Sequence, residues 1–94
     1  MKKNVISVDE YCRIHDVDVA FIDYLVDNGL VQLIALNGQR FIPHEALNVV
    51  GRLTSWHVEL EVNPAGLEVA NRLYERVLEL QEEVRRLRRA LKNA

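Results

Sequence analysis

The chain has 94 residues, of which 49% are hydrophobic and 28% are charged. This size and composition are those of one globular domain, and they exclude a disordered chain or a membrane span, because no apolar run is long enough to cross a bilayer. A chain this short buries a modest share of its surface, so we expect association to contribute to its stability.

The N-terminal residues and the cysteine count predict a cytoplasmic protein. Met1 to Ile6 contains Lys2 and Lys3 but neither the apolar stretch nor the cleavage site of a secretory signal. The single cysteine, Cys12, cannot form an internal disulfide.

Charge is unevenly distributed along the chain. Residues 1–63 contain five Lys and Arg against nine Asp and Glu, a net charge of −4, whereas residues 64–94 contain seven against five, a net charge of +2. The first part is therefore acidic, and the second is basic with its cations crowded near the end.

Two short helices are predicted first. Ser7-Val8-Asp9-Glu10 has the pattern of a capping box, and the helix that follows places Val8, Tyr11 and Cys12 on one face before it fades at His15. Asp16 or Asp18 can cap the second helix, and Gly29 ends it in a left-handed conformation. Its predicted core residues are Phe21, Ile22, Leu25 and Val26.

A hairpin and a third helix complete the predicted head. Val31 to Leu36 and Gln39 to Ile42 are rich in strand formers, and Asn37-Gly38 between them favours a type I′ turn. Pro43 suits the first turn of a third helix that ends between Trp56 and Glu61. Its predicted core residues are Ala46, Leu47, Val50 and Leu53. We therefore predict a mainly α fold with a winged helix-turn-helix head over residues 1–62.

One long helix is predicted over residues 63–94. Asn63-Pro64 is a start signal, and about 30 helical residues span roughly 45 Å at 1.5 Å per residue, so the end must project beyond the head. Leu67 to Leu73 is expected to pack on the head. Apolar residues three and four apart, beginning within this same stretch and continuing to Leu91, form a coiled-coil seam, which predicts a homodimer of either helix orientation. In a parallel pair Glu83 would meet Arg88 of the second copy. The predicted dimer residues are Leu73, Val77, Leu80, Val84, Leu87 and Leu91.

The sequence lacks the motifs of catalysis and metal binding. Cys12 and His15 share a helix face, but His44 and His57 do not complete a four-ligand site, and Cys12 is more simply a buried apolar residue. Gly-rich phosphate loops and nucleophile elbows are absent from the sequence. We expect no enzyme activity, no cofactor, no metal and no small-molecule substrate.

The second helix argues against nucleic acid as a partner. Residues 16–28 contain four aspartates and no Lys or Arg, whereas affinity for DNA comes largely from cations at phosphates. The acidic face is either ordinary solvated surface or a binding site for a basic protein. Its partner-binding candidates are Asp16, Asp18, Asp23 and Asp27. The competing hypothesis is a DNA-binding regulator that uses Arg13, Arg40 and Arg52.

Several motifs resemble known families. Glu10-Tyr11-Cys12, Asn28-Gly29-Leu30-Val31 and Arg40-Phe41-Ile42 look like a MerR-type helix-turn-helix head. Asn63-Pro64-Ala65-Gly66 after the third helix, with the Leu-Gln-Glu-Glu-Val-Arg-Arg-Leu tail from Leu80, is similar to the bacterial chaperone modulator family CbpM. This resemblance implies a protein that binds the J-domain of a DnaJ/CbpA-type co-chaperone and inhibits its cooperation with the Hsp70 chaperone DnaK.

Overall fold

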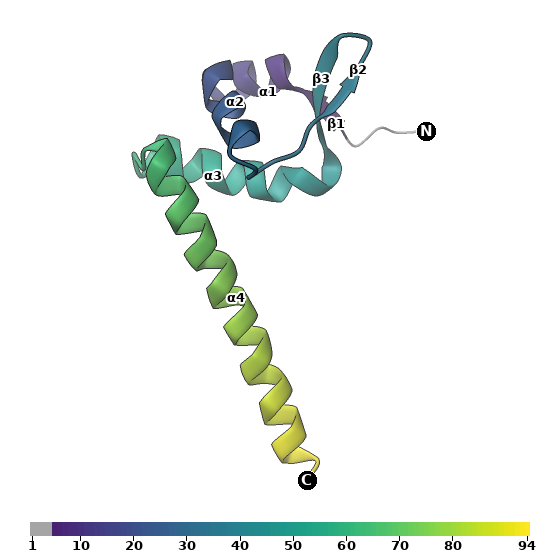
Figure 1. Ribbon diagram of the computed structural model, residues 1–94, viewed down its shortest axis with the longest axis vertical. Coiled ribbons are helices and arrows are strands. Elements are labelled where there is room, and N and C mark those ends of the chain that lie inside the picture. The colour runs from purple at the N-terminus through teal and green to yellow at the C-terminus, as the bar shows by residue number, and fades with distance from the viewer. Residues whose placement is uncertain (1–4) are drawn as a thin grey trace.

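The computed structural model describes residues 5–94, and in this range three short strands and four α-helices follow one another. Figure 1 shows the early elements gathered into a head, from which the last helix leaves as a single rod. The elements are β1 (Val5–Ser7), α1 (Val8–His15), α2 (Val19–Asp27), β2 (Ile34–Leu36), β3 (Gln39–Pro43), the 3-10 turn η1 (His44–Ala46), α3 (Leu47–Glu59) and α4 (Pro64–Lys92).

The predicted fold class is confirmed: the protein is mainly α, with a helix-turn-helix head, a hairpin wing and a long C-terminal helix. Its greatest extent is 56 Å, and much of this length comes from α4 (Figure 1). Residues 1–4, which include the Lys2 and Lys3 of the sequence analysis, lie outside the described residues.

The helix-turn-helix is set by local capping. Ser7 Oγ accepts the Glu10 N–H at 3.1 Å, which forms half of the predicted capping box, while the Glu10 carboxylate lies 3.8 Å from the Arg13 guanidinium. Asp16 ends α1 in the left-handed conformation, at φ 57°. Asp18 occupies the predicted N-cap position of α2. Its side chain, however, makes no capping hydrogen bond.

The wing is one hairpin of a three-stranded antiparallel sheet with the order β1-β3-β2. Asn37 and Gly38 both have positive φ, 52° and 75°, as the predicted type I′ turn requires. The prediction that a strand begins at Val31 was wrong, because β2 starts at Ile34 and the Val31 side chain is buried in the core instead. The strand β1 was not predicted.

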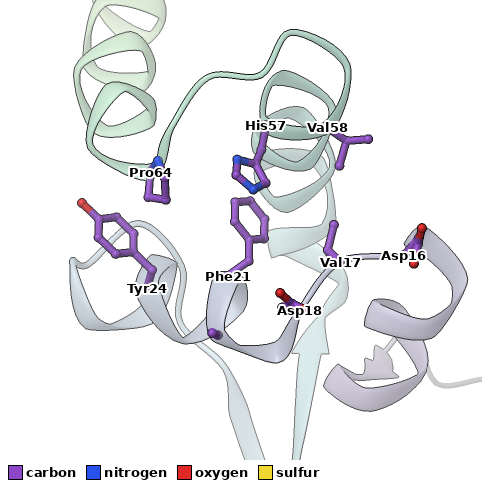
Figure 2. A pocket seen from close by; sticks show the side chains of 9 residues that line it. Asp16, Val17, Asp18, Phe21, Tyr24, His57, Val58 and Pro64 are labelled. Atoms are coloured by element: carbon purple, nitrogen blue, oxygen red, sulfur yellow. The ribbon is translucent and has the colours of Figure 1, made fainter.

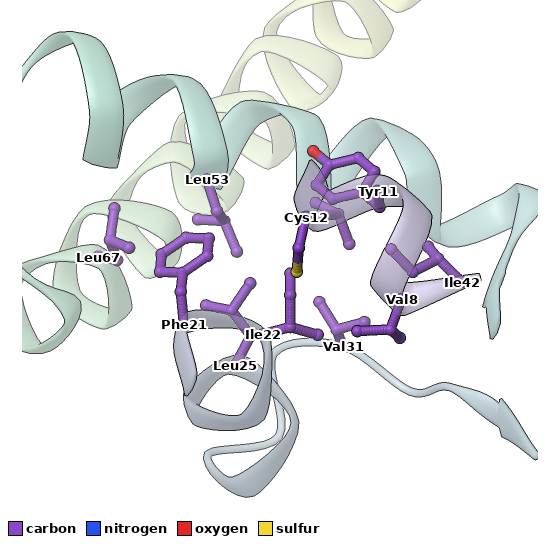
Figure 3. Close-up of a cluster of buried hydrophobic side chains, with 11 residues drawn as sticks. Val8, Tyr11, Cys12, Phe21, Ile22, Leu25, Val31, Ile42, Leu53 and Leu67 are labelled. Atoms are coloured by element: carbon purple, nitrogen blue, oxygen red, sulfur yellow. The ribbon is translucent and has the colours of Figure 1, made fainter. Parts of the chain in front are cut away.

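The core of the head draws on every helix. Figure 3 shows Phe21, Ile22 and Leu25 of α2 facing Leu53 of α3, with Leu67 of α4 closing one end of the cluster. Tyr11 is buried too, and its hydroxyl shares a 2.9 Å hydrogen bond with Thr54 Oγ1. Burying the phenol raises the pKa of Tyr11.

The third helix begins later than predicted. Pro43 ends β3 and precedes η1, so α3 starts only at Leu47. Proline fits there because its missing N–H is not needed at the end of a strand. Val50 and Leu53 are fully buried as predicted, and Ala46 and Leu47 pack at the edge of the core.

A tight junction directs α4 away from the head. Asn63 Oδ1 accepts the Gly66 N–H at 2.7 Å and Pro64 occupies the first turn, as predicted. A Cβ on Gly66 would lie 3.0 Å from Val62 Cγ1 and 3.1 Å from Asn63 Oδ1. Glycine is therefore the residue that allows this cap to form, which gives a physical reason for the Asn63-Pro64-Ala65-Gly66 motif.

Only the base of α4 packs on the head. Leu67 and Asn71 are buried, and Arg52 Nη2 donates to Asn71 Oδ1 at 2.8 Å. The prediction that packing extends to Leu73 was wrong, because Leu73 is 61% exposed. Residues 72–92, here called the rod, are all exposed, although the Tyr74 ring near the start of the rod still lies edge-on to Trp56 of α3, with the ring centres 5.7 Å apart.

Candidate protein-binding surfaces

The outer face of α2 is open to solvent. The helix buries Phe21, Ile22 and Leu25 on its inner side, whereas Ala20 and Asp27 on the other side are exposed. Residues 20, 23 and 27 fall on one side of a helix because they are three and four apart. The helix from Val19 to Asp27 contains no Lys or Arg, so its own charge is negative.

Asp23, one of the predicted partner-binding residues, forms an ion pair within the head. Its Oδ1 lies 2.7 Å from Arg40 Nη1 of β3, and both side chains are a little over 40% exposed. An exposed pair of this kind contributes at most about 1 kcal/mol, but it offsets one negative charge of α2 and occupies the cation of the wing.

Arg52 is also held inside the fold. Besides its hydrogen bond to Asn71, its guanidinium carbon lies 4.3 Å from the ring centre of Tyr74 and 5.8 Å from that of Trp56. These cation–π contacts fix the side chain between α3 and α4. Of the three arginines considered for DNA contact, Arg13 alone is highly exposed, and it lies near Glu10.

A groove of about 430 Å³ opens beside the start of α2 (Figure 2). Residues from the turn before α2, from α2 itself, from the end of α3 and from the start of α4 contribute to it. Two predicted partner-binding residues, Asp16 and Asp18, lie along it, whereas Asp23 and Asp27 do not. The lining residues are Asp16, Val17, Asp18, Ala20, Phe21, Tyr24, His57, Val58 and Pro64.

Aromatic rings form the body of the groove. The rings of Phe21 and His57 stack with their centres 4.5 Å apart and their planes 12° apart, as Figure 2 shows. His57 Nδ1 donates to the Val62 carbonyl at 2.9 Å, since a carbonyl can only accept. The Tyr24 hydroxyl donates to Glu68 Oε2 of α4 at 2.6 Å. This hydrogen bond to a carboxylate raises the pKa of Tyr24.

The predicted dimer residues lie exposed along the rod. Their exposed fractions run from 45% for Leu80 and Val84 to 77% for Leu91. Arg76 pairs with Glu79 and Arg85 with Glu82, which supports the helix locally. Glu83, considered for pairing with a second copy, lies 3.8 Å from Arg86 of its own helix. The seam, as we call it, consists of Leu73, Val77, Leu80, Val84, Leu87 and Leu91.

Neither a metal-binding cluster nor a membrane-spanning helix is found within residues 5–94. These residues contain no group of three or more His, Cys, Asp or Glu side chains that could hold a metal ion. Within the same range, no helix combines the length and the apolar character needed to cross a bilayer. Cys12 is buried, and burial, with smaller contributions from Asp9 and Asp18, raises the pKa of its thiol. A raised pKa disfavours the reactive thiolate form.

The sequence analysis missed the groove and the Asp23–Arg40 pair. Phe21 and His57 are distant in sequence, and both fit an ordinary helical pattern. Asp23 and Arg40 belong to different elements, and no local motif links them. These features arise when the elements pack, so a reading of local patterns does not reveal them.

Comparison with known proteins gives a family for this fold. A family model described as "MerR HTH family regulatory protein" matches residues 6–89, which covers the head and most of α4. No individual curated protein and no solved structure matches the chain. The match extends over far more than half of the sequence and agrees with the helix-turn-helix, the wing and the long helix described above. The chain therefore belongs to the MerR helix-turn-helix family of regulatory proteins.

Proposed function

We propose that this protein is a chaperone modulator that binds the J-domain of a DnaJ/CbpA-type co-chaperone and limits its cooperation with an Hsp70 chaperone. The motif resemblance to the CbpM family suggests this role within the broader MerR family. In this proposal the protein is a homodimer joined through the seam, and it acts by occupying a surface rather than by catalysing a reaction.

The placement of charge in the head supports the proposal most directly. Residues 5–63 contain three arginines and nine Asp and Glu, a net charge of −6. Arg40 forms an ion pair with Asp23, and Arg52 donates a hydrogen bond to Asn71, so two of the three arginines already have partners inside the fold. The surface that remains around α2 is acidic and favours a cationic polypeptide.

The same placement weakens the competing hypothesis of a DNA-binding regulator. A helix-turn-helix protein places its second helix in the major groove and contacts phosphates from nearby cations. Here that helix carries Asp23 and Asp27 and no Lys or Arg. Two of the three arginines considered for DNA contact, Arg40 in the wing and Arg52 in the third helix, make contacts within the fold instead.

Inhibition by occupancy follows from the charge of the partner. A J-domain presents a basic helix to its Hsp70 chaperone, so an acidic protein that covers this helix competes for the same surface. Attraction between opposite charges speeds the encounter and fixes the relative orientation of the two proteins. No bond needs to be made or broken in either protein.

The direct test is a titration of a purified J-domain into this protein by calorimetry, with a duplex oligonucleotide titrated in parallel. We expect saturable binding of the J-domain and none of the duplex at moderate salt. Asp27→Lys should weaken J-domain binding by several-fold, because it reverses a charge on the exposed face of α2. Glu45→Lys makes the same change in η1 and should have little effect.

Two results would contradict the proposal. One is a J-domain that does not bind the wild-type protein. The other is tight binding of duplex DNA that weakens steeply as salt rises, since that salt dependence marks phosphate contacts. Asp23 is less suitable for this test, because its substitution also breaks the pair with Arg40.

A further inference from the structure

We infer that the groove beside the start of α2 receives one long cationic side chain, a lysine or an arginine, from the basic helix of the partner. This inference rests on the proposed function and identifies the part of the surface that the partner binds. The groove is lined by residues 16–18, Ala20, Phe21, Tyr24, His57, Val58 and Pro64.

The shape and lining of the groove suit the stem of such a side chain. The stacked rings of Phe21 and His57 lie at its centre in Figure 2, with Tyr24 and Pro64 on one side and Val17 and Val58 on the other. Lysine and arginine bury their methylene groups along apolar surfaces while the charged end stays solvated or paired.

The charges around the groove suit the end of that side chain. Asp16 and Asp18 are among the residues that line the groove, and the lining contains no Lys or Arg. Asp18 stands at the N-cap of α2 but makes no capping hydrogen bond, so its carboxylate is free to accept one from a ligand. A purely apolar side chain would leave both carboxylates without a cation, which is why we assign a basic residue rather than an aliphatic one.

The four aspartates predicted from the sequence therefore have different roles. Asp16 and Asp18 would contact the inserted side chain directly. Asp23 holds the wing through Arg40, and Asp27 lies at the far end of α2, where it adds to the attraction without reaching the groove.

The test fills the groove without changing any charge. Ala20 lines the groove and is exposed, so Ala20→Phe should obstruct it while leaving the core of the head untouched. We expect J-domain affinity to fall by about tenfold or more, as for the loss of a central contact. Ala35→Phe makes the same substitution on the exposed strand β2, away from the groove, and should change the affinity by less than about twofold.

Two further measurements support this test, and the first of them uses the wild-type protein, so it does not depend on how a variant folds. Amide chemical shifts of the wild-type protein, followed by NMR as the J-domain is added, should move most at Val17, Ala20 and Val58. The double substitution Asp16→Asn with Asp18→Asn should weaken binding and flatten its dependence on salt, because it removes the charges that face the ligand.

The outcomes separate the two proposals. Suppose that the wild-type protein binds the J-domain, that Ala20→Phe binds it equally tightly, and that the chemical shifts change only on other surfaces. These results would contradict the assignment of the groove as the binding site and would leave the proposed function standing. A wild-type protein that does not bind the J-domain overturns the proposed function, and the inference falls with it. If Ala20→Phe does not fold, the shift map of the wild-type protein decides.

Discussion

The head and the rod treat apolar side chains in opposite ways. The head gathers residues from α1, α2, α3 and the base of α4 into one buried cluster. The rod arranges the seam along one side of a single helix and leaves it exposed. The contrast teaches that the head buries its apolar residues within one chain, whereas the described part of the chain leaves the apolar face of the rod uncovered.

The energetic scale of this difference is large. Burying one Leu or Val side chain contributes about 1.5–3 kcal/mol, and most of the stability of a helix in a protein comes from packing of its apolar face. A second copy that covers the seam would supply the missing half of the core. The comparison therefore predicts that substitutions in the rod change assembly, while substitutions in the head change folding.

The largest effect is expected from a charge in the seam. Leu80→Asp places a carboxylate in the middle of the proposed interface, where burying it without a partner is costly. We expect the dimer to be lost, as measured by sedimentation equilibrium, with a fall in helix content by circular dichroism.

Leu78→Asp provides the matched control for this prediction. Leu78 and Leu80 are both 45% exposed and lie two residues apart on the same helix, but Leu78 is not part of the seam. The dimer should survive Leu78→Asp. If the two substitutions have equal effects, or if the dimer persists in Leu80→Asp, the seam is not the dimer interface.

The next largest effect is expected where the rod joins the head. Leu67 is fully buried, so Leu67→Ala leaves a cavity in the head and should lower its free energy of unfolding by about 2–5 kcal/mol. Urea unfolding followed by the fluorescence of Trp56 measures this change. Leu78→Ala removes the same atoms from an exposed position and should cost less than about 1 kcal/mol. If the two substitutions cost the same, the base of α4 is not part of the core.

The smallest effect concerns tyrosine ionisation in the head. The pKa of Tyr11 is raised by burial and that of Tyr24 by its hydrogen bond to Glu68, both from an ordinary value of 10.0. A raised pKa means that the neutral phenol is favoured in the folded state. The stability contributed is complete below pH 10.0 and is lost as the pH rises through the raised values.

An absorbance titration of tyrosinate measures this shift. Glu68→Gln should bring the pKa of Tyr24 back toward 10.0 and leave Tyr11 unchanged, because the side chain of Tyr11 bonds to Thr54 instead. An unaltered titration curve in Glu68→Gln would show that the bond between α2 and α4 does not persist in solution.

Features set by neighbouring residues could be predicted from the sequence. Ser7 before α1, Asn37-Gly38 in the wing and Asn63-Pro64 at the start of α4 each act within a few residues, and each lies where it was expected. The spacing of apolar residues likewise identified the buried faces of α1, α2 and α3. Interactions between neighbouring residues were therefore sufficient to predict the order and type of most helices and strands.

Features set by packing could not be predicted in this way. The strand β1 has three residues and exists because β3 pairs with it. Arg40 was considered a contact for DNA until the structure placed it 2.7 Å from Asp23. The groove depends on the angle between α2 and α3, which no single motif encodes.

The hydrogen bond between Tyr24 and Glu68 gives the molecule a mechanical property. Tyr24 is a wall of the groove, and Glu68 belongs to the base of an uninterrupted helix of 29 residues, about 43 Å long. A lever of this length turns a tilt of about 5° at its base into a movement of roughly 4 Å at its tip. A displacement of the Tyr24 ring that tilted the base of α4 would therefore move the far end of the chain further than the ring itself.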